Sequence, residues 1–145
     1  MAIERRALLA LAGAALAPAA RAAETVLGFD ALYKSVGVRG LVFSDRMAAL
    51  SGQTVAMAGY MAPPLQAESR FFVLTREPLS LCPFCQSDAE WPIDIVVIYL
   101  KREAPLLDGG TRLVVRGRLD TGSWTDPDSG FVSLVRLVDA EFRTA

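Results

Sequence analysis

Between residues 53 and 142, five stretches carry the apolar patterns of β-strands. The stretch 53–61 has apolar residues at every second position, and Gly59 among them predicts a bulge or a sharp coil. The stretch 93–101 has an almost continuous apolar middle, which predicts burial on both of its faces. The other predicted strands cover residues 70–75, 111–119 and 131–142.

The segments between these stretches are rich in turn-forming residues. Pro63-Pro64 ends the first predicted strand, Asp108-Gly109-Gly110 leads into the fourth, and residues 120–130 read as a loop. Residues 102–108 leave room for at most one helical turn between the third and fourth strands. Five strands, a glycine-interrupted first strand and a long loop before the fifth resemble the OB-fold. The sequence therefore predicts an all-β protein, a five-stranded OB-like Greek-key barrel with short N-terminal helices.

Two short helices are predicted ahead of the barrel. Apolar residues spaced three, one and three positions apart predict the first over residues 30–36. The second is predicted over 45–50, because Ser44 is a good N-cap and Gly52 follows its end. Residues 23–52 are therefore expected to form a helical extension and residues 53–145 the barrel.

Residues 1–22 have the pattern of an export signal. Arg5 and Arg6 precede an apolar run, and Ala20-Arg21-Ala22 provides an A-x-A cleavage site. The run is too short to span a bilayer, which needs about twenty residues. The paired arginines resemble the twin-arginine export pattern, although Glu4 replaces the usual serine or threonine. We therefore expect export to the periplasm, by the twin-arginine route or, alternatively, through a general secretory signal.

Removing the predicted signal changes the composition of the chain. Hydrophobic residues make up 52% of the whole sequence and the net charge is −1. Without Glu4, Arg5, Arg6 and Arg21 the net charge becomes −3. No later segment is apolar for long enough to cross a bilayer, so we expect a soluble protein that does not span the membrane.

Basic residues raise the question of a nucleic-acid partner, because OB-folds often bind nucleic acid through basic and aromatic side chains. Arg112, Arg116 and Arg118 share one face of the fourth predicted strand. The acidic net charge and the predicted export argue against nucleic acid. We expect these arginines to form a solvated strand face.

The chain contains two cysteines and no histidine. Without imidazole there is no Ser-His-Asp triad, no Cys-His pair and no HExxH zinc site. An ordinary hydrolytic enzyme is therefore not expected.

The sequence Cys82-Pro83-Phe84-Cys85 is the one motif with intrinsic reactivity. Two thiols three positions apart can close a small disulfide or point together at one metal ion. Three interpretations stay open: thiol-disulfide exchange, a metal site and a static disulfide. Exchange enzymes place the motif at the start of a helix, whereas here it falls between two predicted strands. A disulfide that closes so short a loop adds little stability.

As a metal site, the two cysteines supply half of a tetrahedral shell for zinc or copper(I). The other ligands are expected from Asp88, Glu90 or Asp94, from Met57 or Met61, or from a second molecule. Carboxylates suit zinc and thioethers suit copper(I). The two methionines share a face of the first predicted strand, where such residues more often fill a core.

The order of these features resembles a family of exported bacterial proteins classed as a domain of unknown function. The resemblance implies an OB-like barrel outside the cytoplasm and a link with metal handling or membrane transport systems. It implies no established reaction. Many members have a histidine in the cysteine loop, where this chain has Phe84 and Cys85, which leaves the thiol pair as the only ligand nucleus. The matching positions are Gly52, Val55, Gly59, Tyr60, Met61, Pro63, Cys82 and Cys85.

Together these patterns predict a soluble periplasmic binding or accessory protein, not an enzyme, with Cys82 and Cys85 as its functional pair. Zinc or copper is the expected cofactor, and a protein partner or transport system in the periplasm is the expected partner. Trp124 and the acidic tip Asp126-Pro127-Asp128 are candidates for a partner surface or a half-buried lid. The alternatives are a periplasmic thiol-disulfide oxidoreductase and a partner-binding module with a structural disulfide.

Overall fold

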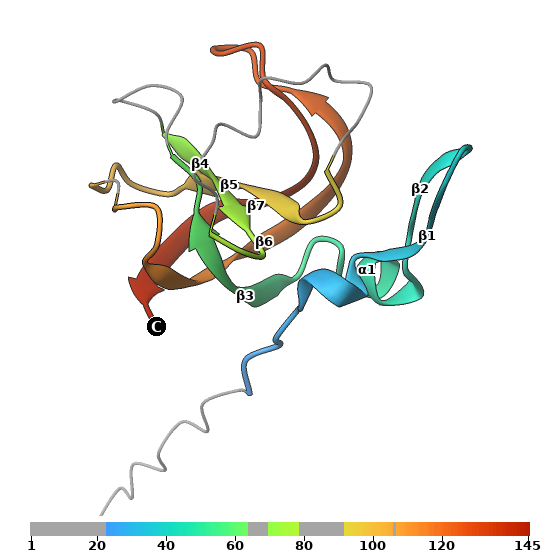
Figure 1. Ribbon diagram of the computed structural model, residues 1–145, viewed down its shortest axis with the longest axis horizontal. Coiled ribbons are helices and arrows are strands. Elements are labelled where there is room, and N and C mark those ends of the chain that lie inside the picture. The colour runs from blue at the N-terminus through green and yellow to red at the C-terminus, as the bar shows by residue number, and fades with distance from the viewer. Residues whose placement is uncertain (1–22, 64–69, 79–91, 106) are drawn as a thin grey trace, which may run out of the picture.

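The computed structural model describes residues 23–63, 70–78, 92–105 and 107–145. Within this part, five strands close into a barrel in the order β3-β4-β5-β7-β6, with β6 pairing back to β3 (Figure 1). All neighbours are antiparallel except β5 and β7, which are parallel. This order is that of the five-stranded OB barrel, so the predicted all-β fold is confirmed. The barrel strands are β3 (Thr54–Met61), β4 (Phe71–Thr75), β5 (Ile95–Leu100), β6 (Arg112–Thr125) and β7 (Val132–Thr144).

The interior of the barrel is filled by the alternate residues of its strands. Val55, Met57 and Met61 on β3 are fully buried, as the alternation predicts, and they pack with leucines, valines and isoleucines of the other four strands. Gly59 lies on the same face. A Cβ at Gly59 would lie 2.6 Å from the carbonyl oxygen of Thr75, so this glycine allows β4 to approach β3 closely. The predicted bulge is absent there, because β3 pairs with β6 without a break in register.

Strand β5 is buried on both faces, as its continuous apolar run predicts. One face contributes Val96 and Ile98 to the barrel interior. The other face carries Ile95 and Val97 into a second, smaller cluster on the outside of the barrel. The outer face of a barrel strand is shielded from water only where other side chains pack against it. Here Phe131, from the β6–β7 connection, packs against this second cluster.

Strand β6 is longer than predicted. Residues 120–125, expected to belong to a loop, continue the strand and pair with β7 as far as Thr125 opposite Val132. The turn-forming Gly122 has φ +102° and sits where the register shifts between Thr121 and Trp124, so it forms a bulge inside the ribbon. The turn-forming Gly122 therefore bends the strand instead of ending it.

A second bulge lies further along the same ribbon. Asp139 has φ 50°, and the pairing of β7 shifts here against both β6 and β5. Opposite it, a Cβ on Gly117 would lie 3.0 Å from the Cβ atoms of Leu137 and Ala140. The bulge therefore bends β7 where it runs between β5 and β6, and Gly117 leaves the space for it.

The N-terminal part contains one α-helix and one hairpin among its described residues. The predicted helix over 30–36 is wrong: a 3₁₀ turn η1 (Phe29–Ala31) is followed by the hairpin β1 (Tyr33–Gly37) and β2 (Gly40–Phe43). Gly40, with φ +97°, allows the tight turn between the two strands. The stacked rings of Tyr33 and Phe43 favour cross-strand pairing over a helix.

The helix α1 (Asp45–Leu50) forms where it is predicted. The Ser44 side chain accepts a hydrogen bond of 3.1 Å from the Met47 N–H, and Gly52 follows with φ +80°. Met47, Leu27, Phe29 and Leu32 belong to the same core cluster as the barrel interior. The N-terminal elements thus cover one end of the barrel and share its core (Figure 1).

The predicted export signal, residues 1–22, lies outside the described residues. In the part of the chain that the structure describes, no helix is long and apolar enough to cross a membrane.

Candidate binding face

The segment that carries the cysteines joins β4 to β5, the second and third strands of the barrel. Cys82, Cys85, Asp88 and Glu90 lie outside the described residues. In OB barrels the face of these two strands, together with the loops that follow the first and the fourth strand, forms the usual ligand site. The cysteine segment connects the two strands of that face along the chain.

The two ends of this segment are held together. The Arg76 N–H donates a 3.1 Å hydrogen bond to the Asp94 carbonyl oxygen, and the side chains of Arg76 and Asp94 form a 3.7 Å ion pair. The buried Thr75 hydroxyl donates hydrogen bonds to the carbonyl oxygens of Tyr60 and Glu77, at 3.2 and 2.7 Å. Asp94, one of the predicted ligands, therefore acts in this structure as part of the clasp.

The two candidate methionine ligands lie inside the barrel. Met57 and Met61 are fully buried in the core cluster, on the face predicted for core filling. The Met61 sulfur also accepts a 3.3 Å hydrogen bond from the Leu107 N–H. Among the described residues, no group of three or more histidine, cysteine, aspartate or glutamate side chains could hold a metal ion. Cys82 and Cys85 are not among these residues, so a metal site built on them stays a prediction.

The outer face of β4 and β5 carries a group of aromatic side chains, which we call the outer cluster. It consists of Phe71, Tyr99, Phe131 and Trp124. Phe71 lies 5.3 Å, centroid to centroid, from both Tyr99 and Phe131, and the Trp124 ring meets Tyr99 edge to face at 5.3 Å. Such pairs stabilise a face beyond the area that they bury. Trp124 stays 38% exposed, so its ring covers part of the outer cluster and keeps one side open to solvent.

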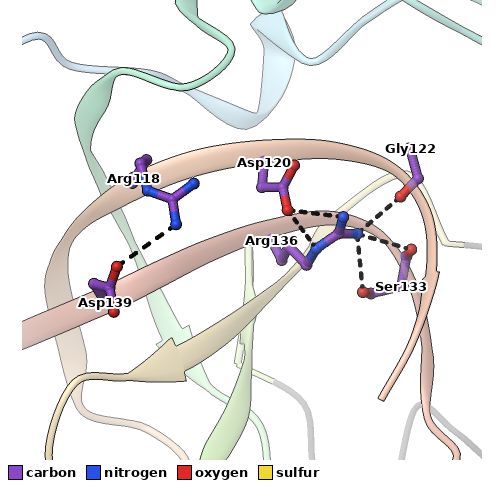
Figure 2. Close-up of polar contacts among 6 residues, drawn as sticks. All are labelled: Arg118, Asp120, Gly122, Ser133, Arg136 and Asp139. Atoms are coloured by element: carbon purple, nitrogen blue, oxygen red, sulfur yellow. Dashed lines mark hydrogen bonds and ion pairs between the residues drawn. The ribbon is translucent and has the colours of Figure 1, made fainter. Parts of the chain in front are cut away.

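Arg136 of β7 lies among Asp120, Gly122 and Ser133 (Figure 2). Its side chain is 6% exposed, and its Nε and Nη2 both donate to one carboxylate oxygen of Asp120, at 3.0 and 2.8 Å. Its Nη1 donates to the carbonyl oxygens of Gly122 and Ser133, at 2.8 and 3.3 Å. The guanidinium carbon is 5.2 Å from the Trp124 ring centroid. A buried charge with this many partners ties β6 and β7 together at the distal end of their ribbon.

The hydroxyl of Tyr99 is buried close to the carboxylate of Asp126. The contact does not complete a hydrogen bond of good geometry among the described residues. Burial, followed by the negative charge of Asp126, raises the pKa of Tyr99 well above its ordinary value, and Arg136 partly opposes the rise. Tyr99 is thus a neutral phenol throughout the physiological range.

The predicted acidic tip has a structural function at its first residue. Asp126 is 8% exposed, and its Oδ1 accepts hydrogen bonds from the N–H groups of Asp128 and Ser129, at 2.8 and 3.3 Å. An aspartate that bonds the backbone two and three residues ahead fixes a tight turn. Gly130, with φ +73°, completes the turn into β7.

The predicted basic face of β6 is exposed, as expected. Arg116 pairs with Glu24 at 3.4 Å and Arg118 pairs with Asp139 at 3.6 Å, and all four side chains are at least 45% exposed. Exposed pairs of this length contribute little to stability. The arginines line shallow charged hollows on the outside of β3, β6 and β7 and not a built anion site.

Sequence reasoning missed Arg136. Its signal was present, since it is the one charged residue in the apolar run Leu134–Val138. A charge in the middle of a strand whose neighbours are all apolar predicts a buried and paired group. What the pattern could not provide was the partner, because Asp120 lies 16 residues earlier in the chain.

The strand order and the covered outer face define the class of protein: a five-stranded OB-type barrel with an aromatic face on its second and third strands. A solved structure of a DUF3299 family protein from Pseudomonas aeruginosa PAO1 is similar to this chain, with a TM-score of 0.54 at 12% identity, covering 85% of this chain and 97% of the other. This likeness shows a shared fold, and it agrees with the resemblance to a bacterial family of unknown function. No family model matches the chain, and no curated protein matches it.

Proposed function

We propose that this protein is an exported binding or accessory protein in which Cys82 and Cys85 bind a thiophilic metal ion, zinc or copper(I). The observation that carries the proposal is the place of the cysteine segment. It connects the two strands that form the ligand face of an OB barrel, and its ends are clasped by Arg76 and Asp94. Because Arg76 and Asp94 already hold the two ends of the segment together, less conformational entropy is lost when the segment orders around a ligand.

The chemistry of the available donors supports this choice. Two thiolates in a C-x-x-C spacing are typical ligands of zinc and copper(I). Met57 and Met61 are occupied in the core, so Asp88 and Glu90 are the proposed additional ligands within the segment. Two thiolates with two carboxylates favour zinc, and two thiolates alone favour copper(I).

Metal content and thiol state test the proposal together. The protein is recovered from the exporting compartment, its metals are counted by elemental analysis, and its free thiols are titrated before and after addition of Zn²⁺ or Cu(I). We expect one metal ion per chain, or per pair of chains, and none in the Cys82→Ser/Cys85→Ser variant. The matched control Met61→Leu keeps its metal, because that sulfur lies in the core.

Other outcomes of this experiment decide between the alternatives. A pair that cycles between dithiol and disulfide without binding metal would support the thiol-disulfide oxidoreductase. A disulfide that resists reduction, in a chain without metal, would support the partner-binding module. Either result contradicts the metal proposal.

The proposed export is tested separately. Cell fractionation is expected to place the protein in the periplasm. Arg5→Lys/Arg6→Lys retains the charge but removes the twin-arginine pair, and it should hold the protein in the cytoplasm. Arg21→Lys is the matched control and should be exported normally. Export of the double variant would favour the general secretory route.

A further inference from the structure

The β1–β2 hairpin projects away from the barrel, on the side of α1 (Figure 1). In the described part of the chain its two strands form a separate two-stranded sheet. Its base is anchored by the stacked rings of Tyr33 and Phe43, which pack against the core. A two-stranded hairpin gains little stability by itself, so a hairpin that extends beyond its anchor points to a use for its outer end.

The outer end, residues 34–42, presents aliphatic side chains to solvent. We call it the hairpin tip. Val38 in the turn is fully exposed, and Val36 and Val42 are 58% and 51% exposed. These are three of the six large hydrophobic side chains that are exposed in the described residues. Val36 lies opposite Leu41 on one face of the hairpin and Val42 lies opposite Ser35 on the other, so apolar side chains are exposed on both faces and at the turn of this projection. Exposed apolar side chains at the end of a projection indicate a contact surface.

The hairpin tip is also basic in an acidic protein. Lys34 and Arg39 are its only charged residues, and no acidic residue occurs between Asp30 and Asp45. Within the described residues, neither Lys34 nor Arg39 forms an ion pair. The hairpin tip thus has a charge of +2, whereas the remainder of residues 23–145 is acidic.

We propose that the hairpin tip docks on the surface of an anionic lipid bilayer. Exposed aliphatic side chains flanked by unpaired cations match the apolar layer and negative headgroups of such a surface. A second copy of the chain is a poorer occupant, because a two-fold contact of hairpin tips would bring like charges together. A strand added from another protein would pair with a β1 or β2 edge and leave Val38 in the turn uncovered.

The depth of docking follows from the backbone. The outer edges of β1 and β2 carry N–H and C=O groups that need hydrogen-bond partners. Headgroups and interfacial water supply such partners, whereas the hydrocarbon interior does not. The valines therefore enter only the interface, and binding is weak and reversible.

Docking on a membrane rests on the proposed export for its biological setting, since an exported protein faces bilayers on both sides of the periplasm. The contact itself depends on the hairpin tip alone. The Cys82→Ser/Cys85→Ser variant, which tests the metal proposal, is therefore expected to bind vesicles as the parent does. Failure of the metal proposal and failure of the docking proposal are distinguishable in this way.

Vesicle flotation tests the docking. The processed protein is mixed with vesicles of phosphatidylglycerol and phosphatidylcholine, or of phosphatidylcholine alone. We expect flotation with the anionic vesicles, weakening as salt is raised. Lys34→Gln and Arg39→Gln should each lower the partition coefficient about fivefold. Lys101→Gln/Arg102→Gln is the matched control, since both side chains are exposed and basic but lie outside the hairpin.

A fluorescent residue locates the contact. In the Val38→Trp variant the tryptophan emission should shift to shorter wavelength when vesicles bind. Brominated lipid should quench this emission more than that of the parent protein. Val26→Trp is the control, because Val26 is 62% exposed but lies outside the hairpin, and it should not be quenched. Val38→Ser should lower binding on the order of fivefold without loss of stability, because its side chain contacts little of the protein.

Several results would overturn the proposal. These are equal binding to neutral and anionic vesicles, equal quenching at positions 26 and 38, and unchanged binding of the charge variants. Self-association that depends on Val38, with no response to vesicles, would instead identify a second copy as the occupant. Binding of the hairpin to a protein strand without lipid would equally contradict the membrane surface.

Discussion

Two ion pairs join β6 to β7 at different points along one ribbon, and they differ in almost every physical respect (Figure 2). Arg136 is 6% exposed and lies 2.8 Å from Asp120, whereas Arg118 is 50% exposed and lies 3.6 Å from Asp139. Arg136 also has two backbone carbonyl oxygens and an aromatic ring around it. The same pair of residue types therefore stabilises the fold in one place and contributes little in the other, because only Arg136 is shielded from water, whereas its partner Asp120 is 42% exposed.

The largest expected effect comes from removing the buried arginine. Arg136→Ala leaves the carbonyl oxygens of Gly122 and Ser133 without their donor and opens a space beneath Trp124. We expect the free energy of unfolding to fall by about 2–4 kcal/mol, measured by urea denaturation. Arg136→Met keeps most of the volume and should cost less. A loss below about 0.5 kcal/mol would make the two arginines equivalent.

The next effect comes from the ring that covers Arg136. Trp124→Ala removes the cation–π contact and the edge-to-face contact with Tyr99, and it should lower the free energy of unfolding by about 1–3 kcal/mol. Trp124→Phe keeps an aromatic face and should recover most of the loss. If the alanine variant is as stable as the parent, the ring is a binding surface and has no structural function.

A third, smaller effect concerns pH. The pKa of Tyr99 is raised in the folded protein, so unfolding releases a phenol that ionises near pH 10. This contribution to stability is complete below pH 10 and is lost as the pH rises from 10 toward the folded pKa. Denaturation curves measured between pH 8 and 11 should show the loss in the parent protein. Tyr99→Phe should reduce it, and an unchanged pH profile in that variant would refute the assignment.

The smallest effect belongs to the exposed pair. Arg118→Ala and Asp139→Asn should each change the free energy of unfolding by no more than about 0.5 kcal/mol. The change in the free energy of unfolding in the double variant should equal the sum of the changes in the two single variants, within error. In a double-mutant cycle of the same design, Arg136 and Asp120 should show strong coupling. Coupling above about 1 kcal/mol between Arg118 and Asp139 would remove the contrast on which the comparison rests.

The strands of the barrel could be predicted because their signals are local. Alternation over β3, the continuous apolar run of β5 and the Ser44 cap of α1 depend on neighbours within a few residues. The hairpin over 33–43 could not be separated from a helix by spacing alone. The hairpin is favoured by the ring contact between Tyr33 and Phe43, and these residues are ten positions apart, beyond the range of a spacing pattern.

The candidate site was predicted in its chemistry but not in its surroundings. The sequence placed Cys82 and Cys85 between two strands, and those strands are β4 and β5, the second and third of the barrel. It proposed Met57 and Met61 both as ligands and as core residues, and the closed barrel places them in the core. It singled out Trp124 but not the outer cluster that Trp124 joins, because the residues that meet there come from β4, β5, β6 and the β6–β7 turn.

The sequence by itself determined the barrel class, the missing imidazole, the thiol pair and a helix cap, since each follows from residue type and short spacing. Only the tertiary structure decided which surfaces are shielded from water. Arg136 is buried because β6 continues through Gly122 and brings Asp120 and Trp124 over it from 16 and 12 residues away. The burial of a charge depends on every group that excludes water from it, and those groups are brought together only by the folding of distant segments.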